Sequence, residues 1–540
     1  MLATQDAITM ENAPGKENEF ANGVADATEQ VASEAVLLSS QTGEQDLTLD
    51  PQDWPSFRRL AHRALDALLD FQENARDKPV WQSVNSRAES LFAQDAPHRG
   101  VGAEQVVGEM LEHVAPFPTG NFHPRFWGWV CGTGTPTGML AEMIAAGTNT
   151  PAGTFNDAAT RVENQVVRWM RQLFSFPDGS TGLLTSGGSV ANVIGLAVAR
   201  DVGLGEGTDD VTRWGLAAQG GQPVFYASAE VHSSIVKAAQ TLGLGRDSLR
   251  KIAVDDAYRL RLDLLERQIH EDRAAGLTPF AVVGNAGSVN TGSIDDLEAI
   301  AAIAKRERLW FHVDGAIGAL AMMAPSLEPM LRGIEQADSL AFDFHKWLYV
   351  PYEAGCVLVR DGDAHRRSFA ATASYLAAPP RGIAAEPDST NGRGPQLSRG
   401  FKALKVWAQI REHGLDRLGQ QMEQNVAHIR HLEKRVEAWP DLELLAPVAL
   451  NILCFRYRPY RAEEEHWNAI NQEILMRLQE DGIAAPSSTV LDGRFALRVA
   501  NTNQRTRRED FDLLARETVR IGREVEASWM ASQTASEDHG

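Results

Sequence analysis

The feature that most constrains the fold is an alternation, between about residues 120 and 365, of short apolar runs with longer stretches of helical spacing. The runs hold few polar side chains and have the length of strands; they lie at 182–185, 223–227, 280–283, 309–313, 339–342 and 356–359. A strand that is apolar on both faces is buried on both, and the intervening helices supply the cover. The pattern therefore predicts an α/β protein whose large domain has a mostly parallel central sheet.

The segments on either side of this region predict an arm, a loop and a second domain. Apolar residues at helical spacing predict an N-terminal helical arm over 51–118, and the large domain is then expected over 119–375. A stretch rich in Pro, Gly and Ala predicts a long loop at 376–397, and loops of this length are often functional. Mixed helix and strand patterns predict a smaller α+β C-terminal domain over 398–526.

The two ends of the chain, 1–50 and 527–540, are predicted to be disordered tails. Residues 1–50 hold ten Asp or Glu side chains against the single Lys16, and Phe20 is their one aromatic residue. Such a segment cannot bury enough apolar area to offset the entropy of ordering.

Charge and cysteine usage exclude several classes of function. The formal net charge of −20 disfavours nucleic acid and anionic membranes as partners, because binding them relies on clustered Lys and Arg. Cys131, Cys356 and Cys454 are widely spaced and form no Cys/His ligand cluster, so we expect a reduced, cytoplasmic protein with no metal site. No basic and apolar leader and no apolar stretch of about 18 residues is present, so neither a secretion signal nor a membrane span is expected.

A lysine within an apolar run is the first candidate for chemistry. Lys346 lies in the run AFDFHKW at 341–347, where Phe344 and Trp347 make full exposure unexpected. A desolvated lysine has a lowered pKa and is available as a neutral nucleophile toward an aldehyde. Lys346 is therefore a candidate imine former, and a surface lysine that snorkels to water is the alternative.

The second candidate is a carboxylate that ends an apolar strand. Asp314 closes the run FHVD at 311–314 and is followed by Gly315 and Ala316. Ligands of open α/β sheets bind outside the carboxyl ends of the strands, and a buried carboxylate there needs a cationic partner. The protonated ring nitrogen of pyridoxal phosphate (PLP) is such a partner, and small neighbours let a flat ring approach. Asp314 and Lys346 together predict a PLP site, although a helix cap is the more frequent role of a lone Asp after a strand.

Glycines and histidines add to this prediction. The run TSGGS at 185–189 lies between a predicted strand and a predicted helix, so backbone amides near Gly188 and Ser189 would face an anion such as phosphate. A Ser N-cap on a tight turn is the alternative. His232 follows another strand and could stack on the cofactor ring or be a structural histidine, and His345 is a candidate contact of the phosphate or of a substrate carboxylate.

Blocks of sequence in a fixed order carry a resemblance to a known family. They are HPRFWG at 123–128, TSGGSVAN at 185–192, HSS at 232–234, GNAGSVNTGSID at 284–295, HVDGAIG at 312–318, the run 338–347, and SR at 398–399 with ALKVW at 403–407. Together they resemble the group II PLP-dependent amino acid decarboxylases, on the aspartate aminotransferase-like scaffold known as fold type I. The resemblance implies a carboxy-lyase that converts an L-amino acid to its amine and carbon dioxide through a Lys346 aldimine and a quinonoid intermediate.

The resemblance also implies roles around the cofactor ring. Lys346 would hold PLP as the internal aldimine, and Asp314 would pair with the ring nitrogen. Ala316 would lie against one face of the ring. His232 would stack on the other face and help to orient the substrate carboxylate.

At the phosphate end, the resemblance implies a second group of contacts. Gly188, Ser189 and Asp343 would lie around the phosphate, with His345 nearby. Ser288 stands where the family usually has a threonine beside the phenolic oxygen of the ring, and it keeps the hydroxyl group.

The predicted loop departs from the family pattern. In these decarboxylases a tyrosine on a mobile loop from the neighbouring subunit commonly protonates Cα, and residues 376–397 contain no tyrosine. Tyr375 and His232 are the alternative proton donors. Relatives without that tyrosine can divert the intermediate toward oxygen, so an aldehyde-forming oxidative decarboxylase or a carbon–carbon lyase on the same scaffold is the alternative function.

Two further alternatives are a PLP-binding protein without turnover and an aminotransferase. The intact set of Lys346, Asp314 and His232 disfavours the first, and the decarboxylase-like surroundings of Lys346 and Asp314 disfavour the second. The resemblance implies a C2 homodimer whose sites are completed by the neighbouring subunit. The substrate is expected to be a small-molecule amino acid, whose side chain the sequence does not identify.

Overall fold

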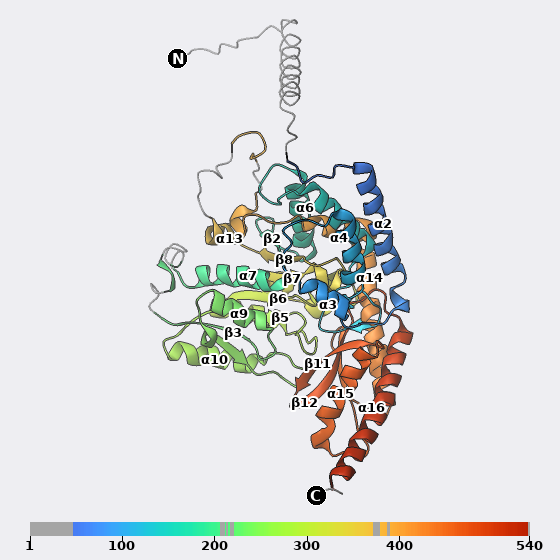
Figure 1. The fold of residues 1–540 in the computed structure, drawn as a ribbon. Coiled ribbons are helices and arrows are strands. Elements are labelled where there is room, and N and C mark those ends of the chain that lie inside the picture. The colour runs from blue at the N-terminus through green and yellow to red at the C-terminus, as the bar shows by residue number, and fades with distance from the viewer. Residues whose placement is uncertain are drawn as a thin grey trace, which may run out of the picture. The chain divides into compact units, whose positions relative to one another are not determined.

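The computed structural model describes residues 47–205, 211, 214–216, 221–370, 379–385 and 389–537 (Figure 1). Most of the predicted tail at 1–50 lies outside these residues, as do Tyr375 and part of the predicted loop at 376–397. The chain divides into two compact units, Met1–Arg63 and Ala64–Gly540, and the division falls inside helix α2 (Trp54–Glu73). In the first unit the Asp53 carboxylate accepts the backbone N–H of Ser56 at 3.1 Å and caps the start of α2.

Short helices follow α2 in the predicted arm, which confirms its helical character. They are η1 (Ala75–Asp77), α3 (Ser86–Phe92), α4 (Ala103–Glu109) and η2 (Met110–Val114). Asn85 caps α3, because its side chain accepts the N–H of Ala88 at 3.0 Å.

The second unit contains a seven-stranded sheet with the order β2-β8-β7-β6-β5-β3-β4. Its strands are β2 (Thr181–Thr185), β3 (Pro223–Ser228), β4 (Leu249–Ile252), β5 (Thr278–Asn285), β6 (Trp310–Asp314), β7 (Ser339–Asp343) and β8 (Gly355–Val359). Only β8 runs antiparallel to its neighbours, so the predicted mostly parallel sheet is confirmed. The edge strand β4 was not predicted, because Arg250 and Lys251 interrupt its apolar pattern.

Helices cover both faces of this sheet, as the continuous apolar strands require. Along β8, Val357 and Val359 belong to the core that includes helices α7 and α9, whereas Cys356 and Leu358 belong to the opposite core. The helices of this region are α5 (Pro136–Thr148), α6 (Ala158–Leu173), α7 (Gly188–Gly203), α9 (Ser233–Thr241), α10 (Leu262–Ala274), α11 (Leu297–Glu307), α12 (Phe344–Trp347) and α13 (Gly362–Phe369). Short 3-10 turns complete it: η4 (Arg246–Ser248), η5 (Ala319–Met323), η6 (Glu328–Leu331), η7 (Ile334–Gln336) and η9 (Asn391–Arg393).

A second sheet, with five strands, forms the predicted smaller α+β domain (Figure 1). Its order is β1-β11-β12-β10-β9, with β1 (Phe126–Trp127), β9 (Leu442–Leu444), β10 (Ile452–Tyr457), β11 (Ala485–Leu491) and β12 (Arg494–Ala500). Its helices are α14 (Ala403–Ala438), η10 (Glu464–His466), α15 (Trp467–Glu480) and α16 (Arg508–Glu537).

Strand β1 lies within the range predicted for the large domain, yet it pairs in parallel with β11 of the small sheet. The side chain of Trp127 explains this placement. Its ring stacks on Phe511 with centroids 4.6 Å apart, and its indole N–H donates to Thr506 Oγ1 at 3.1 Å. Burial of one large aromatic ring thus assigns this short strand to the small domain.

The predicted C-terminal tail needs a correction. Helix α16 continues to Glu537, so most of the range 527–540 is helical. Trp529 is half-buried, and its ring lies 5.2 Å from that of His466, which extends the packed face of the helix past residue 527. In the described part of the chain, no helix is long and apolar enough to cross a membrane.

Candidate active site

The carboxyl ends of β5, β6 and β7 lie side by side, and the predicted residues gather at this edge of the sheet. Asp314 ends β6, and its register partner Asn285 ends β5. Asp343 ends β7, and helix α12, which carries Lys346, begins at the next residue. This is the edge at which open α/β sheets bind ligands.

Two adjoining cavities of about 300 and 330 Å³ open at this edge and share His232, Ala316 and Lys346 as lining residues. The first is also lined by Asn285, Asp314 and Arg498. The second is also lined by Gly188, Ser189, Asp343 and His345. The structure thus brings together every predicted site residue except Ser288.

The backbone around Lys346 is held from two directions. Its neighbour Trp347 is fully buried and donates its indole N–H to Asn425 Oδ1 at 3.0 Å. Gly132 packs so closely that a Cβ atom there would clash with the carbonyl groups of His345 and Lys346. Only glycine fits at that position, and the lysine backbone is fixed as a result.

The Lys346 side chain points into the cavity rather than out to bulk water. It is 20% exposed, and its Nζ lies 2.8 Å from Asp343 Oδ2. Lys405 is buried more deeply, but its Nζ pairs with Glu142 at 2.5 Å and it lines neither cavity. Of Lys346 and Lys405, Lys346 is the one placed to react with a ligand.

Asn192 connects the predicted residues to one another. Its Nδ2 group donates to Asp314 Oδ2 and to Ser234 Oγ, both at 3.0 Å. Its Oδ1 atom lies 2.9 Å from His312 Nε2, which must therefore carry the hydrogen. The sequence alone does not indicate this role for Asn192, because its partners lie in α9 and β6, far away along the chain.

The imidazole of His312 is held neutral by its surroundings. Its Nδ1 lies 2.8 Å from Ser339 Oγ, and that hydroxyl in turn accepts the indole N–H of Trp310 at 2.8 Å. Complete burial lowers the pKa of His312 to about 3. The result is a buried chain of hydrogen bonds, from Trp310 through Ser339, His312 and Asn192, that orients the Asp314 carboxylate.

His232 is the N-cap of α9, and one of its ring nitrogens is already engaged. Its Nδ1 lies 2.8 Å from Ser234 Oγ and accepts the Ser234 backbone N–H at 3.2 Å. Because the Ser234 hydroxyl accepts from Asn192, it donates to Nδ1, and Nε2 carries the remaining hydrogen. Although His232 lies at the exposed rim of the cavity, desolvation lowers its pKa, with Lys346 adding to the effect and Asp314 opposing it.

At the phosphate end of the predicted site, the Asp343 carboxylate accepts a hydrogen bond from the first backbone N–H of α7. The Gly188 N–H donates to Asp343 Oδ1 at 2.6 Å. His345 accepts the Ala354 N–H on Nδ1 at 3.1 Å, so its Nε2 carries the hydrogen, 3.8 Å from Asp343 Oδ2. The ring of Tyr352, which sequence analysis did not single out, lies 4.5 Å from that of His345 and lines the same cavity.

Ser288 is absent from the lining of both cavities. Its hydroxyl lies 2.8 Å from Ser293 Oγ and 3.1 Å from Thr291 Oγ1, and it also accepts the Ser293 N–H at 3.2 Å. Gly287, with a φ of +94°, makes the turn that leads from β5 into this loop. A role for Ser288 beside the cofactor ring stays a prediction.

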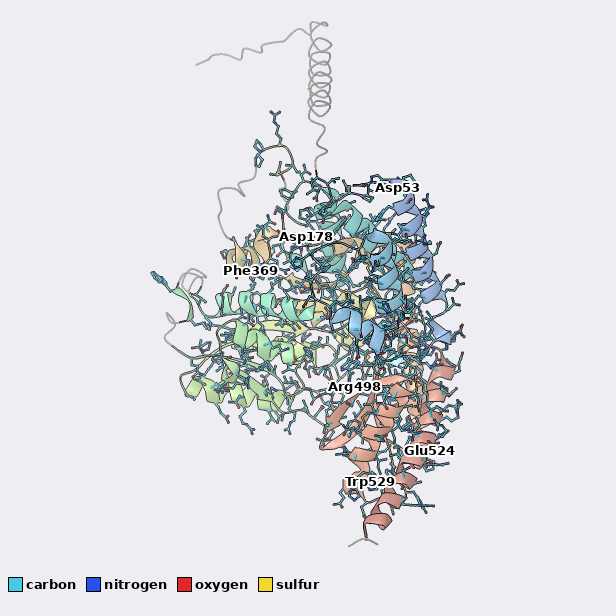
Figure 2. The ribbon with its side chains drawn as sticks, viewed as in Figure 1. Asp53, Asp178, Phe369, Arg498, Glu524 and Trp529 are labelled. Carbon is cyan, nitrogen blue, oxygen red and sulfur yellow. The ribbon has the colours of Figure 1, made fainter. Side chains whose placement is uncertain are left out.

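Arg498 on β12 is a cation that sequence analysis missed (Figure 2). It is 3% exposed and forms no ion pair among the described residues. Its guanidinium donates to the carbonyl oxygens of Trp129 at 2.6 Å, Asn290 at 3.0 Å and Val289. Desolvation lowers its pKa. A buried cation that has no acidic partner and lines a cavity is suited to bind an anionic ligand.

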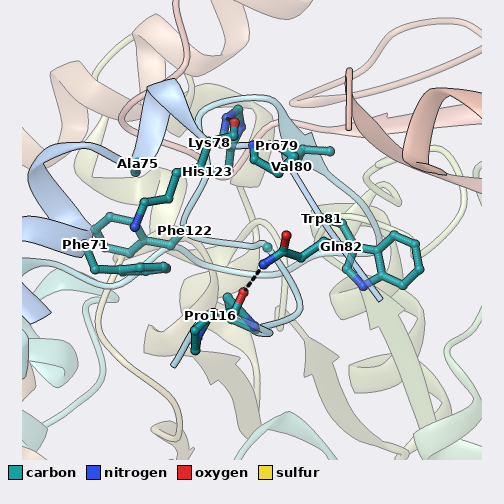
Figure 3. Close-up of a pocket in the computed structure, with 12 residues that line it drawn as sticks. Phe71, Ala75, Lys78, Pro79, Val80, Trp81, Gln82, Pro116, Phe122 and His123 are labelled. Carbon is teal, nitrogen blue, oxygen red and sulfur yellow. Dashed lines mark hydrogen bonds between the residues drawn. The ribbon is translucent and has the colours of Figure 1, made fainter. Parts of the chain in front are cut away.

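A separate cavity of about 260 Å³ lies in the arm region and has a different character (Figure 3). Phe71 and Phe122 lie side by side there, and the Lys78 ammonium sits 4.2 Å from the centre of the Phe71 ring. Gln82 closes one side by donating to the Pro116 carbonyl at 2.8 Å. None of the predicted site residues lines this cavity.

The described end of the predicted loop is anchored by a buried ion pair. Arg399 forms a bidentate pair with Glu163, at 2.6 and 2.9 Å, and both residues are buried. The Thr390 N–H donates to the Gly153 carbonyl at 2.9 Å. These contacts fix where the segment rejoins the large domain.

The residues present fit the predicted cofactor. Asp314 is 5% exposed and forms no ion pair in the described part of the chain, so the protonated ring nitrogen of PLP would supply its missing cation. Beside it, Ala316 offers a small side chain, and Lys346 an amine. An aldehyde-bearing pyridine ring matches this set of groups.

Comparisons with known proteins identify the family of this chain. Residues 86–458 match the family described as the pyridoxal-dependent decarboxylase conserved domain. The aromatic-L-amino-acid decarboxylase of Bacillus atrophaeus is 30% identical over 476 residues, which cover 87% of this chain and 96% of that protein. The phenylacetaldehyde synthase of Arabidopsis thaliana is 27% identical over 463 residues, which cover 84% of this chain and 93% of that protein.

A solved structure, that of Oryza sativa TDC with PLP and tryptamine, has a TM-score of 0.80 at 25% identity, covering 89% of this chain and all of that one. The chain belongs to the family of PLP-dependent amino acid decarboxylases. It is a carboxy-lyase of fold type I that uses PLP, so the predicted family, fold, cofactor and reaction class are confirmed.

Proposed function

We propose that this protein decarboxylates an aromatic L-amino acid, with Lys346 carrying the cofactor, Asp314 pairing with the ring nitrogen and His232 covering the ring. The observation that carries the proposal is the convergence of these three residues on cavities that also contain Arg498. An aromatic substrate is supported by the similarity to the Bacillus atrophaeus enzyme. It is also supported by the apolar lining of the first cavity, which includes Val130, Val289 and Ile317 together with Trp129.

Arg498 is the proposed partner of the substrate carboxylate. An amino acid zwitterion has one anionic group, and the described residues at this cavity offer Arg498 as a buried cation without an acid. A guanidinium binds a carboxylate through paired N–H groups and therefore fixes its orientation as well as its position. In this proposal His232 adds a hydrogen bond from Nε2–H to the same carboxylate.

The reaction depends on how these residues hold charge and protons. Bound PLP supplies an electron sink for the electron pair released when the bond to the carboxyl carbon breaks. The Asp314 carboxylate, oriented by Asn192, is proposed to keep a proton on the ring nitrogen. Asp343, whose Oδ2 lies 2.8 Å from Lys346 Nζ, would hold the lysine side chain in place whenever its amine is released.

An aldehyde-forming oxidative decarboxylase is the second candidate function. Two observations favour it: residues 376–397 contain no tyrosine, and the phenylacetaldehyde synthase of Arabidopsis thaliana is among the relatives. Of the proposed alternative proton donors, Tyr375 lies outside the described residues. His232 has a lowered pKa, which makes the neutral ring a poor acid at neutral pH.

The experiment is a substrate panel in which carbon dioxide, amine, aldehyde and hydrogen peroxide are measured together. Tyrosine, phenylalanine, tryptophan and glutamate are supplied to the PLP-loaded protein and to Lys346→Ala. The proposal expects carbon dioxide and amine from an aromatic amino acid, and neither product from Lys346→Ala. Aldehyde and peroxide in equal amounts would select the second candidate, and turnover of glutamate alone would reject an aromatic substrate.

We infer further that the protein is a C2 homodimer. Large apolar side chains are exposed on the arm helices and on α5: Met110 is 47%, Val114 53%, Met143 53% and Ile144 55% exposed. Exposed apolar surface favours association, and closed two-fold dimers are the commonest oligomers. Analytical ultracentrifugation is expected to give a dimer that Met143→Glu weakens, and an active wild-type monomer would reject the inference.

We propose a cytoplasmic location. It is supported by the three cysteines, all of which are free thiols in the structure. Fractionation of cells that express the full chain is expected to recover it with cytoplasmic enzymes, and recovery outside the cytoplasm would reject the proposal.

A further inference from the structure

We propose that Tyr352 is a catalytic residue whose hydroxyl gives the proton that replaces the departing carboxylate at Cα of the substrate. The inference deepens the proposed function and rests on it, because it assumes that the substrate is held at Lys346 and loses carbon dioxide there. When the bond to the carboxyl carbon breaks, its electron pair stays with Cα, and an amine forms only if a donor supplies a proton to that carbon. The tyrosinate then takes a proton back from water, so one solvent proton is consumed for each carbon dioxide released.

The first observation is that Tyr352 shares a cavity with the reactive lysine. Among the described residues it is the one tyrosine that lines either of the two adjoining cavities. A bound substrate replaces Lys346 at the aldehyde carbon of the cofactor, so its Cα lies near the place of the last carbon of the lysine side chain. Asp343 Oδ2 lies 2.8 Å from Lys346 Nζ, and Asp343 is also near enough to act electrostatically on the Tyr352 hydroxyl. The phenol and the lysine amine therefore lie within reach of one carboxylate.

The second observation is the set of contacts that holds the Tyr352 hydroxyl. It is hydrogen-bonded to the Cys131 thiol and to the backbone of Gly132. Gly132 also packs against the carbonyl group of Lys346, and Val130, two residues earlier, lines the first cavity. The hydroxyl is thus held by a segment that runs from the first cavity to the backbone of the reactive lysine.

Three other side chains of these cavities are candidate donors, and each is less suited. The neutral His232 ring is a poor acid, because desolvation lowers its pKa. Desolvation lowers the pKa of His345 as well, with the same consequence. The Lys346 amine is engaged by the Asp343 carboxylate, whereas the Tyr352 hydroxyl is engaged by a thiol, whose sulfur is a weak acceptor. The phenol therefore gives up its hydrogen bond at the lowest cost.

The surroundings of Tyr352 keep its hydroxyl protonated and also let it recover a proton. Burial of the hydroxyl, and after it the nearby Cys131 and Asp343, raises the pKa of Tyr352. The phenol is therefore neutral at physiological pH and able to act as an acid. The side chain as a whole is 49% exposed, so water reaches it and can return the proton after each turnover.

Binding of the cofactor phosphate is the competing role for Tyr352. Its ring lies 4.5 Å from that of His345, and the cavity that they share also contains Gly188 and Ser189 of the predicted phosphate site. The two roles have different consequences when the hydroxyl is removed. Loss of a phosphate contact would weaken PLP binding, whereas loss of a proton donor would leave PLP binding unchanged and alter the product.

The test compares wild type, Tyr352→Phe and Tyr349→Phe, each as the full chain loaded with PLP. Tyr352→Phe keeps the ring beside His345 and removes only the hydroxyl. Tyr349→Phe is the matched control, because its hydroxyl is buried, donates to Asn425 Oδ1 at 2.6 Å and lines neither cavity. Carbon dioxide, amine, aldehyde and hydrogen peroxide are measured from one aromatic amino acid in air, and PLP affinity is measured by fluorescence titration.

We expect the rate of amine formation in Tyr352→Phe to fall by about 100-fold or more, the usual contribution of a general acid. Oxygen then competes for the electron pair at Cα: it takes two electrons and two protons to become hydrogen peroxide, and water releases the aldehyde and ammonia. Aldehyde and peroxide should therefore appear in equal amounts in Tyr352→Phe, whereas Tyr349→Phe should still form amine. PLP affinity should be the same in all three proteins.

A second readout does not depend on the loss of carbon dioxide. The group that adds a proton to Cα also removes it in the reverse direction, so wild type should exchange one Cα hydrogen of the product amine with heavy water. Proton NMR of the amine follows this exchange. We expect Tyr352→Phe to slow it by about 100-fold and Tyr349→Phe to leave it unchanged.

The outcomes separate this inference from the proposed function. Wild type that forms aldehyde and peroxide in place of amine would reject both, because a chain with a competent donor releases amine. Wild type that forms amine, with a Tyr352→Phe variant that forms amine or exchanges hydrogen at the same rate, would overturn the inference and leave the proposed function standing. Weaker PLP binding in Tyr352→Phe with unchanged products would assign the hydroxyl to the phosphate and overturn the inference as well.

Discussion

Replacing Arg498 with methionine gives the sharpest quantitative prediction. The change removes a cation that is 3% exposed and keeps a side chain of similar length. Removing one partner of a buried ion pair costs about 3–5 kcal/mol, which corresponds to a factor of roughly 150 to 4,000 in kcat/KM. We expect the loss mainly in KM if Arg498 holds the substrate carboxylate equally in the ground state and the transition state.

The assay must separate this role from a structural one, because Arg498 also binds the carbonyl groups of Trp129, Val289 and Asn290. The product amine lacks the carboxylate, so Arg498→Met should weaken amino acid binding far more than amine binding. Arg456→Met is the matched control. Arg456 is also buried, but it pairs with Glu443 in β9 and with Glu464 in η10.

The reasoning would be refuted if Arg498→Met weakened the amine and the amino acid by the same factor. That result would mean that Arg498 only shapes the cavity wall. A loss of kcat/KM below about tenfold would likewise contradict an ion pair to the substrate carboxylate. The control is expected to lower stability while leaving the preference for amino acid over amine unchanged.

Three further perturbations test the site. Asn192→Leu removes a hydrogen-bond donor from Asp314 and leaves the buried N–H of His312 without an acceptor. Urea denaturation should therefore show a free energy of unfolding that is lower by about 3 kcal/mol, and a change below about 1 kcal/mol would contradict the hydrogen-bond chain. Asp343→Asn removes a negative charge that accepts the Gly188 N–H and would repel the phosphate of PLP. A fluorescence titration should therefore show PLP binding several-fold tighter, whereas weaker binding would show that the carboxylate helps to hold the cofactor. Burial lowers the pKa of His312 to about 3, so the unfolded chain binds a proton that the folded chain excludes, and stability falls as the pH drops from about 6.5 toward 3. His312→Gln places an amide N–H at the Nε2 position, and this amide does not titrate. The stability of the variant should therefore fall with pH less steeply than that of wild type, by up to about 1.4 kcal/mol per pH unit. Equal slopes in the two proteins would contradict a neutral, buried His312.

The parts of the site that sequence could predict are those set by the strand order and the ends of strands. Asp314 and Lys346 each follow a continuous apolar run, and parallel strands bring their carboxyl ends to one edge whatever the details of packing. Two short apolar runs were therefore enough to place both residues at one edge of the sheet, where they line the same cavity. The same reasoning predicted the mostly parallel sheet and the smaller α+β domain.

The parts that sequence could not predict depend on side chains packing across distant segments. Arg498 reaches the cavity from the small sheet, and its carbonyl partners lie in two other segments. The role of Asn192 arises from contacts with strand β6, which follows much later in the chain. Strand β1 joins the small sheet because Trp127 is buried against Phe511, and no local pattern encodes that contact.

The central claim is that Lys346 carries the cofactor, and chemical trapping tests it most directly. Borohydride reduces the imine between PLP and a lysine to a stable amine, which peptide mass spectrometry then locates. We predict one reduced adduct per chain, on the peptide that contains Lys346, and none on the peptide that contains the buried Lys405. An adduct on Lys405, or trapping that persists unchanged in Lys346→Ala, would contradict the account.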